Sequence, residues 1–123
     1  MSPLARLLHD LRIRSGLRQR VLAEQMGYET SYFSALEVGV KGPPPAEFVD
    51  RLIRALNLSE EEQKTVRRAA AASRRRFQIT HDMPEEVFWM MAELQEHVST
   101  LHPTQVRIIR DTLTLPWNRA GTD

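Results

Sequence analysis

Residues 19–39, QRVLAEQMGYETSYFSALEVG, carry the most informative pattern in this sequence. Its apolar residues predict two short helices on either side of a turn of three or four residues. Such a pair must cross at a steep angle, which requires a small side chain on the first helix and a flexible residue in the turn. Ala23 and Gly27 meet these two requirements. Phe33 and Leu36, three positions apart, give the second helix an apolar inner face and leave its other face free.

The residues around this stretch predict further helices and no strands. Leucines recur at the spacing of three and four that is typical of an amphipathic helix, the run Gly42-Pro43-Pro44-Pro45 cannot be helix interior, and Ser59 with Glu62 forms a capping box. Helices are therefore expected at about 3–15, 18–26, 30–37 and 45–57, and from Ser59 to about Arg76. Because strand-like alternation is absent from this half, the predicted fold class is all-α.

At these positions the chain resembles the Cro/cI-type helix-turn-helix family, also called XRE-like regulators. The residues that carry the resemblance are Leu17, Gln19, Leu22, Ala23, Gly27, Ser34, Leu36, Glu37 and Gly39. It covers roughly residues 4–72. The resemblance implies a five-helix DNA-binding domain whose second motif helix lies in the major groove. The alternative is an αα-hairpin inside an ordinary helical bundle, which the supporting helices disfavour.

The resemblance also implies which residues contact DNA. Gln19 stands where family members grip a phosphate, with Arg18 beside it, and Lys41 stands where they contact the backbone. The recognition helix would reach base edges from Thr30, Ser31 and Ala35, with edge or backbone contacts from Tyr32 and Ser34. None of the three favoured positions is Arg, Gln or Asn, so readout would rest on hydroxyl groups, the Ala35 methyl group and DNA shape.

Two residues depart from the family pattern. Glu29 stands where Ser or Thr usually caps the recognition helix, so it would either cap the helix or accept from a cytosine amino group. Val38 removes one possible phosphate contact. Arg12 and Glu37 coincide with positions that form an internal ion pair in some members, which makes them structural.

The composition is that of one small domain with an appendage. The 123 residues are 27% charged and 41% hydrophobic, with a net charge of +1 and a mean hydropathy of −0.42. Residues 1–76 hold 14 Lys and Arg against 9 Asp and Glu, a net +5, whereas residues 77–123 hold 3 against 7, a net −4. The split suggests a basic module that meets a polyanion and an acidic module with another task. We therefore expect a domain of residues 1–76 and a second of 77–123.

Several classes of function are disfavoured by the residues that are present and missing. Cysteine is absent, which excludes disulfides and thiolate chemistry. No apolar run approaches the roughly 20 residues of a membrane span, and the N-terminus lacks a signal-peptide core, so a cytoplasmic location is expected. The four histidines, His9, His81, His97 and His102, share no metal-ligand spacing and are expected on the surface. Without a catalytic motif, we expect no enzyme, metal or cofactor.

The densest basic cluster in the chain follows the DNA-binding motif at a distance in sequence. It consists of Arg67, Arg68, Arg74, Arg75 and Arg76. These arginines could contact a second phosphate or the minor groove. We prefer the interpretation of a solvated helix face and linker that offset Glu60, Glu61 and Glu62, because the cluster is expected to lie far from the recognition helix.

The C-terminal residues predict two amphipathic helices, one over about 84–101 and one from Pro103 to before Leu115-Pro116. Two helices of this length cannot bury their large residues between themselves. We expect a homodimer interface of Val87, Phe88, Met91, Leu94, Val98, Leu101, Val106, Ile109 and Leu113. The alternatives are a cap on the N-terminal core and a pocket for a small effector at Phe88, Trp89, Met90, Met91 and Trp117. The second is disfavoured, because such residues are more often core or interface.

The sequence thus predicts a homodimeric, sequence-specific transcriptional regulator, a repressor or autoregulator, that binds a pseudo-palindromic operator in double-stranded DNA. The competing hypothesis is an antitoxin or adaptor whose C-terminal half binds another protein, with DNA binding secondary.

Overall fold

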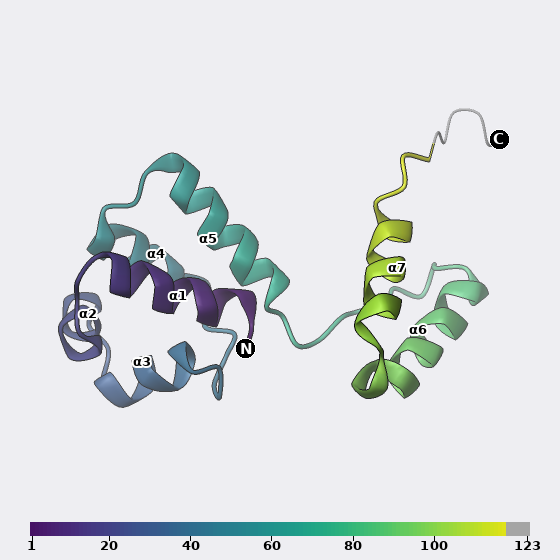
Figure 1. The fold of residues 1–123 in the computed structure, drawn as a ribbon, viewed down its shortest axis with the longest axis horizontal. Coiled ribbons are helices and arrows are strands. Elements are labelled where there is room, and N and C mark those ends of the chain that lie inside the picture. Colours follow the sequence, from purple (N-terminus) through teal and green to yellow (C-terminus); the bar gives the residue numbers. More distant parts are fainter. Residues whose placement is uncertain (118–123) are drawn as a thin grey trace. The chain divides into compact units, whose positions relative to one another are not determined.

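The computed structural model describes residues 1–117. Its regular structure consists of α1 (Pro3–Arg14), α2 (Gln19–Met26), α3 (Thr30–Glu37), α4 (Ala46–Leu56), α5 (Glu60–Ala72), α6 (Glu85–His97), a 3-10 turn (Val98–Thr100) and α7 (Pro103–Leu113). None of the described residues forms a strand, which confirms the all-α class. The chain separates into two units, Met1–Phe77 and Gln78–Asp123 (Figure 1).

The first unit has a continuous apolar core to which all five of its helices contribute. In it, α1 packs against α5 and α3, and α2 packs against α3 and α4. The core consists of Leu4, Leu8, Leu11, Leu22, Ala23, Met26, Phe33, Leu36, Phe48, Val49, Leu52, Ile53, Leu58 and Val66. Full burial of one such large apolar side chain is worth about 1.5–3 kcal/mol relative to exposure. The packing therefore holds α2 and α3 in a fixed mutual orientation.

The ends of these helices follow the expected chemistry. Ser59 and Glu62 form the predicted capping box at the start of α5, with the Ser59 side chain accepting from the Glu62 amide at 3.2 Å. The chain leaves α4 through Asn57, which has a left-handed φ of 49°. Asn tolerates this backbone region better than most residues do, because its short polar side chain can hydrogen-bond locally. The helix bounds of the first unit therefore follow largely from local signals.

The end of α5 differs from the sequence prediction. The helix ends at Ala72, short of the expected Arg76. Ser73 follows it and is only 7% exposed. Its hydroxyl accepts from the Leu4 backbone amide at 2.9 Å and donates to the Ala69 carbonyl oxygen at 2.6 Å. A buried hydroxyl needs partners, and the two bonds supply them. The bond from Leu4 also joins the end of α5 to the start of α1.

The second unit differs from the first in having no interior. None of the described residues from 78 to 117 is buried. The expected single helix over 84–101 is divided into α6 and the 3-10 turn Val98–Thr100. At the start of α7, the His102 Nδ1 accepts from the Thr104 amide at 3.1 Å. His102 is exposed as expected, yet it has a structural task as the N-cap of α7.

No helix within residues 1–117 combines the length and the apolar character that crossing a bilayer requires.

Candidate DNA-binding surface

Helices α2 and α3 are joined by a tight turn whose geometry depends on glycine. Gly27 has a φ of 80°, a left-handed conformation that residues with a Cβ atom adopt at a cost. The amide of Tyr28 then donates to the Ala23 carbonyl oxygen at 2.9 Å, which closes the end of α2. Phe33 and Leu36 on α3 and Leu22 on α2 are buried. The motif expected from residues 19–39 is therefore present. One face of α3 packs into the core, and its opposite face points away from the core.

The last residue of α3 joins three helices. The Glu37 side chain is only 2% exposed. Its Oε1 accepts from Arg12 Nε at 2.9 Å and lies 2.8 Å from His9 Nδ1, and its Oε2 accepts from Gln19 Nε2 at 2.5 Å. Burial raises the pKa of this carboxyl group, but hydrogen bonds from Gln19, Arg12 and His9 outweigh burial and hold the pKa below its ordinary value. Glu37 thus remains a carboxylate that ties α3 to α1 and α2.

This network confirms one expectation and changes two others. Arg12 and Glu37 form the internal ion pair that the resemblance implied. Gln19 was expected to grip a phosphate with its side chain, yet its amide group is held by Glu37. What remains for a phosphate at this position is the open N-terminus of α2, because no side chain caps it. His9, expected as a surface histidine, is 49% exposed but reaches the buried carboxylate.

The outer face of α3 is available for a partner. Thr30 and Ser31 are exposed, and their hydroxyl groups form no hydrogen bond to another residue in the described part of the chain. Ser34 and Ala35, one turn further, are half-buried. Glu29 is the N-cap of α3, but its side chain accepts no capping hydrogen bond. The first backbone amides of α3 are therefore left without a side-chain acceptor, on the end where the helix dipole is positive.

Aromatic side chains support this face from below. The ring of Tyr32 lies 5.4 Å from that of Tyr28 and 6.2 Å from that of Phe48, centroid to centroid. Burial, and secondarily Tyr28, raises the pKa of the Tyr32 phenol above its ordinary value. The ammonium group of Lys41 lies 5.3 Å from the Tyr32 ring centroid, within cation–π range. Lys41, from the loop after α3, thus lies beside Tyr32, which belongs to the first turn of the recognition helix.

Two exposed cations flank the motif. Arg18 is the N-cap of α2 and Lys41 lies in the loop after α3, and both are exposed. Neither forms an ion pair with a carboxylate of residues 1–117. Among the residues expected to contact DNA, Arg18 and Lys41 are thus the ones whose positive charges remain available to a polyanion.

The arginine cluster after α5 is closer to the motif than expected. A guanidinium nitrogen of Arg75 donates to the Gly39 carbonyl oxygen at 2.8 Å, in the loop directly after α3. The expectation that the cluster lies far from the recognition helix is therefore wrong for Arg75. Arg67 pairs with Asp50 at 2.9 Å rather than with the glutamates at the start of α5, and Glu62 pairs with Arg14. The sequence offers no local signal for these contacts, because each joins distant segments.

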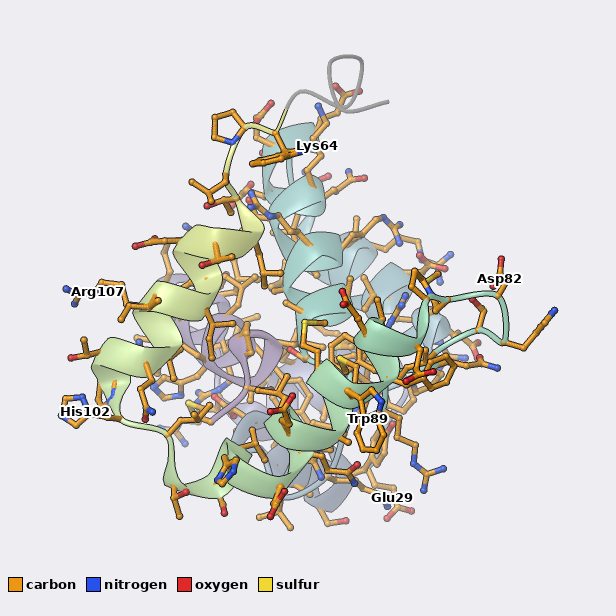
Figure 2. The ribbon with its side chains drawn as sticks, turned by 90° about the vertical axis from the view of Figure 1, so that its right-hand side faces the viewer. Glu29, Lys64, Asp82, Trp89, His102 and Arg107 are labelled. Carbon is orange, nitrogen blue, oxygen red and sulfur yellow. The ribbon has the colours of Figure 1, made fainter. Side chains whose placement is uncertain are left out.

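The residues expected at a dimer interface lie on α6, the 3-10 turn, the following Leu101 and α7, and none is buried within the chain. Val87, Met91, Leu94 and Leu101 are half-buried, while Phe88, Val98, Val106, Ile109 and Leu113 are exposed. Trp89 projects from α6 and donates from Nε1 to Glu85 Oε2 at 3.0 Å (Figure 2). Trp117 is exposed as well. These side chains leave a large apolar area without a covering partner among residues 78–117.

The described residues contain no group of three or more His, Asp or Glu side chains that could hold a metal ion.

Comparison with known proteins identifies the motif. A family model described as a helix-turn-helix domain matches residues 3–66, more than half of the chain. The matched segment includes α1 to α4 and the first half of α5, in agreement with the resemblance to XRE-like regulators. No curated protein and no solved structure matches the chain significantly. On the motif, its geometry and this match, the chain belongs to the helix-turn-helix domain family of DNA-binding proteins.

Proposed function

We propose that this protein is a sequence-specific transcriptional regulator that represses or autoregulates by occupying promoter DNA. The observation that carries the proposal is the outer face of α3, where Thr30 and Ser31 are exposed and have no partner within residues 1–117. Helices of this kind enter the major groove with their N-terminal residues against base edges. The buried side of the same helix is fully used by the core, so the outer face has no other task in the fold.

The contacts we propose fall into two groups. Phosphates meet Arg18, Lys41 and the open N-terminus of α2, which sets orientation and most of the affinity. Bases meet Thr30, Ser31, Ser34 and Ala35, with Tyr32 at the edge. Because short hydroxyl groups discriminate bases less strongly than Arg or Asn does, we expect DNA shape to contribute much of the specificity.

We propose further that the protein acts as a homodimer on a pseudo-palindromic operator. The support is the apolar surface of α6 and α7, which has no cover within the described residues. A two-fold dimer presents two recognition helices to half-sites about one helical turn apart, and it doubles the number of phosphate contacts. No catalytic role, metal or cofactor belongs to this proposal.

The first experiment selects bound duplexes from a random pool and then measures the affinity of the Thr30→Ala/Ser31→Ala variant for the selected site and for an unselected duplex. We expect the specific affinity to fall roughly 10-fold, the effect of about 1.4 kcal/mol, with little change in non-specific binding. A matched control is the Thr65→Ala/Ser99→Ala variant, which removes two exposed hydroxyl groups outside the motif. An equal loss on both duplexes would refute the assigned base contacts, and a pool without enrichment would refute sequence-specific binding.

A further inference from the structure

We infer that Arg75, together with Lys41, forms a second phosphate-contacting site at the C-terminal end of the recognition helix. This inference rests on the proposed function, and it adds to it a residue from outside the helix-turn-helix motif. Arg75 lies beyond residues 3–66, the segment that the family model matches. The site would therefore belong to this chain's own C-terminal extension of the motif.

The first support is the placement of Arg75. Its guanidinium group donates to the Gly39 carbonyl oxygen at 2.8 Å, although the two residues are 36 positions apart in sequence. Lys41 and Arg75 line one small hollow together with Gly42 and Pro43. Figure 1 shows why this is possible, because the chain leaves α5 beside the start of α1 and the loop that follows α3. Two residues with cationic side chains, from separate segments, thus border the same hollow beside the loop that follows α3.

The second support is the charge that remains unbalanced there. Among residues 1–117, no carboxylate oxygen lies within 4 Å of the side-chain nitrogens of Lys41, Arg74 or Arg75. Arg67, by contrast, is neutralised by Asp50 at 2.9 Å. Gathering like charges without a counter-charge is unfavourable in the free protein and favourable beside a polyanion. The cluster is therefore better matched to a phosphate backbone than to the isolated fold.

The third support is the geometry of the guanidinium group. Arginine has five N–H donors in a rigid fork, and the bond to Gly39 uses one of them. The residue is exposed, and within residues 1–117 its side chain forms no hydrogen bond besides the one to Gly39, so the other donors remain available. The Gly39 bond would orient the group, and the free donors would bind a phosphate oxygen flanking the groove that α3 occupies.

The test compares charge removal at Arg75 with charge removal elsewhere on the same part of the chain. Arg75→Gln keeps a donor for Gly39 but loses the charge. Arg68→Gln is the matched control, because Arg68 is exposed on α5 and lies two positions from the buried Val66, on the opposite face. The affinity of each full-length variant for an unselected duplex is measured by fluorescence anisotropy over a series of salt concentrations.

One phosphate contact contributes about 0.9 to the slope of log affinity against log salt. We expect Arg75→Gln and Lys41→Gln each to reduce the slope by about this amount, the double variant to reduce it by about twice as much, and Arg68→Gln to leave it unchanged. Arg75→Lys should keep most of the slope. This last variant also covers the case in which Arg75→Gln loses its fold, as checked by circular dichroism.

Two results would overturn the inference and leave the proposed function intact. The first is an unchanged slope for Arg75→Gln alongside lowered thermal stability, which means that Arg75 only fixes the loop after α3. The second is an equal reduction for Arg75→Gln and Arg68→Gln, which means a general effect of net charge. If the wild-type chain itself binds duplexes without salt dependence, the proposed function fails before the role of Arg75 arises.

Discussion

Among single residues, Glu37 shows how one buried charged side chain can connect several helices. Its carboxylate is buried and interacts with Arg12, His9 and Gln19, which come from α1 and α2. Removal of one partner from a buried ion pair is strongly destabilising, because the remaining charged group then stays buried without an opposite charge beside it. Glu37 therefore matters for the position of α3 although it does not face the proposed DNA surface.

We predict that Glu37→Gln lowers the free energy of unfolding by about 3 kcal/mol near neutral pH. The pKa of Glu37 is lower in the folded state than its ordinary value, so its contribution is fully present above the ordinary pKa and is lost as the pH falls through the folded pKa. The difference in the free energy of unfolding between the wild type and Glu37→Gln should accordingly become smaller in acid. Urea unfolding followed by circular dichroism at neutral pH and at about pH 3 tests this.

The control is Glu24→Gln, since Glu24 is exposed on α2 and forms no ion pair within residues 1–117. Its stability change should stay within about 0.5 kcal/mol at neutral pH. An equal deficit for the two variants, or a deficit of Glu37→Gln that grows in acid, would contradict the role given to Glu37.

The Arg12 and Glu37 pair could be predicted through the resemblance, but the part played by Gln19 and His9 could not. A hydrogen bond between residues 18 or 28 positions apart leaves no periodic signal in the sequence. The same holds for Arg75 and Gly39. Sequence patterns report which face of an element is apolar, whereas contacts between distant polar side chains depend on the packed structure.

At the element scale, the helices of the first unit could be predicted well because their ends carry local signals. The glycine after α2 and the capping box of α5 lie within a few residues of the helix bounds they set. The end of α5 could not be predicted, because the residue that follows the helix, Ser73, is held by a hydrogen bond from the Leu4 amide, 69 positions away. In the second unit, α6 ends at His97 and a 3-10 turn leads to Leu101, whereas the apolar spacing continues through these residues and gives no sign of the change.

We predict that Ser73→Ala destabilises the first unit by about 1–3 kcal/mol, since it leaves the buried Leu4 amide without its acceptor. Thermal or urea unfolding of the full chain measures this loss. Ser31→Ala removes an exposed hydroxyl group with no partner in the described chain and should be nearly neutral for stability. Equal stability of the two variants would show that the Ser73 bonds contribute nothing measurable.

At the scale of the whole molecule, the contrast between the two units is informative. Residues 1–77 hold the entire apolar core, and none of the described residues from 78 to 117 is buried. Exposed apolar patches of this kind commonly mark interaction surfaces. The sequence predicted the surplus of apolar residues in α6 and α7, but it contains no information about which chain covers them.

We predict that the full chain is a dimer in sedimentation equilibrium and that a fragment of residues 1–77 is a folded monomer with weaker, still salt-dependent DNA binding. The fragment retains the complete core, which is the reason to expect it to fold. If full chain and fragment are both monomers, the apolar surface belongs to a different partner, and the antitoxin or adaptor hypothesis replaces the homodimer.

A matched pair of variants locates the dimer interface. Ile109→Glu places a charge on the expected interface of α7 and should produce monomers. Arg107→Glu introduces the same residue two positions away, where Arg107 extends from α7 on the side away from α6 (Figure 2), and it should leave the dimer intact. Dissociation by both variants, or by neither, would exclude this face of α7 as the interface.

The hydrogen bonds of Glu37 also affect how much the protein and the DNA change shape when they bind. Because α3 is held at its last residue to α1 and α2, it cannot shift without breaking several hydrogen bonds at once. A prearranged helix loses little conformational entropy on binding, so the heat-capacity change should follow buried surface alone, without the signature of coupled folding. The adjustment on contact then falls to the double helix, and flexible base steps in the operator would be favoured even where no side chain touches them.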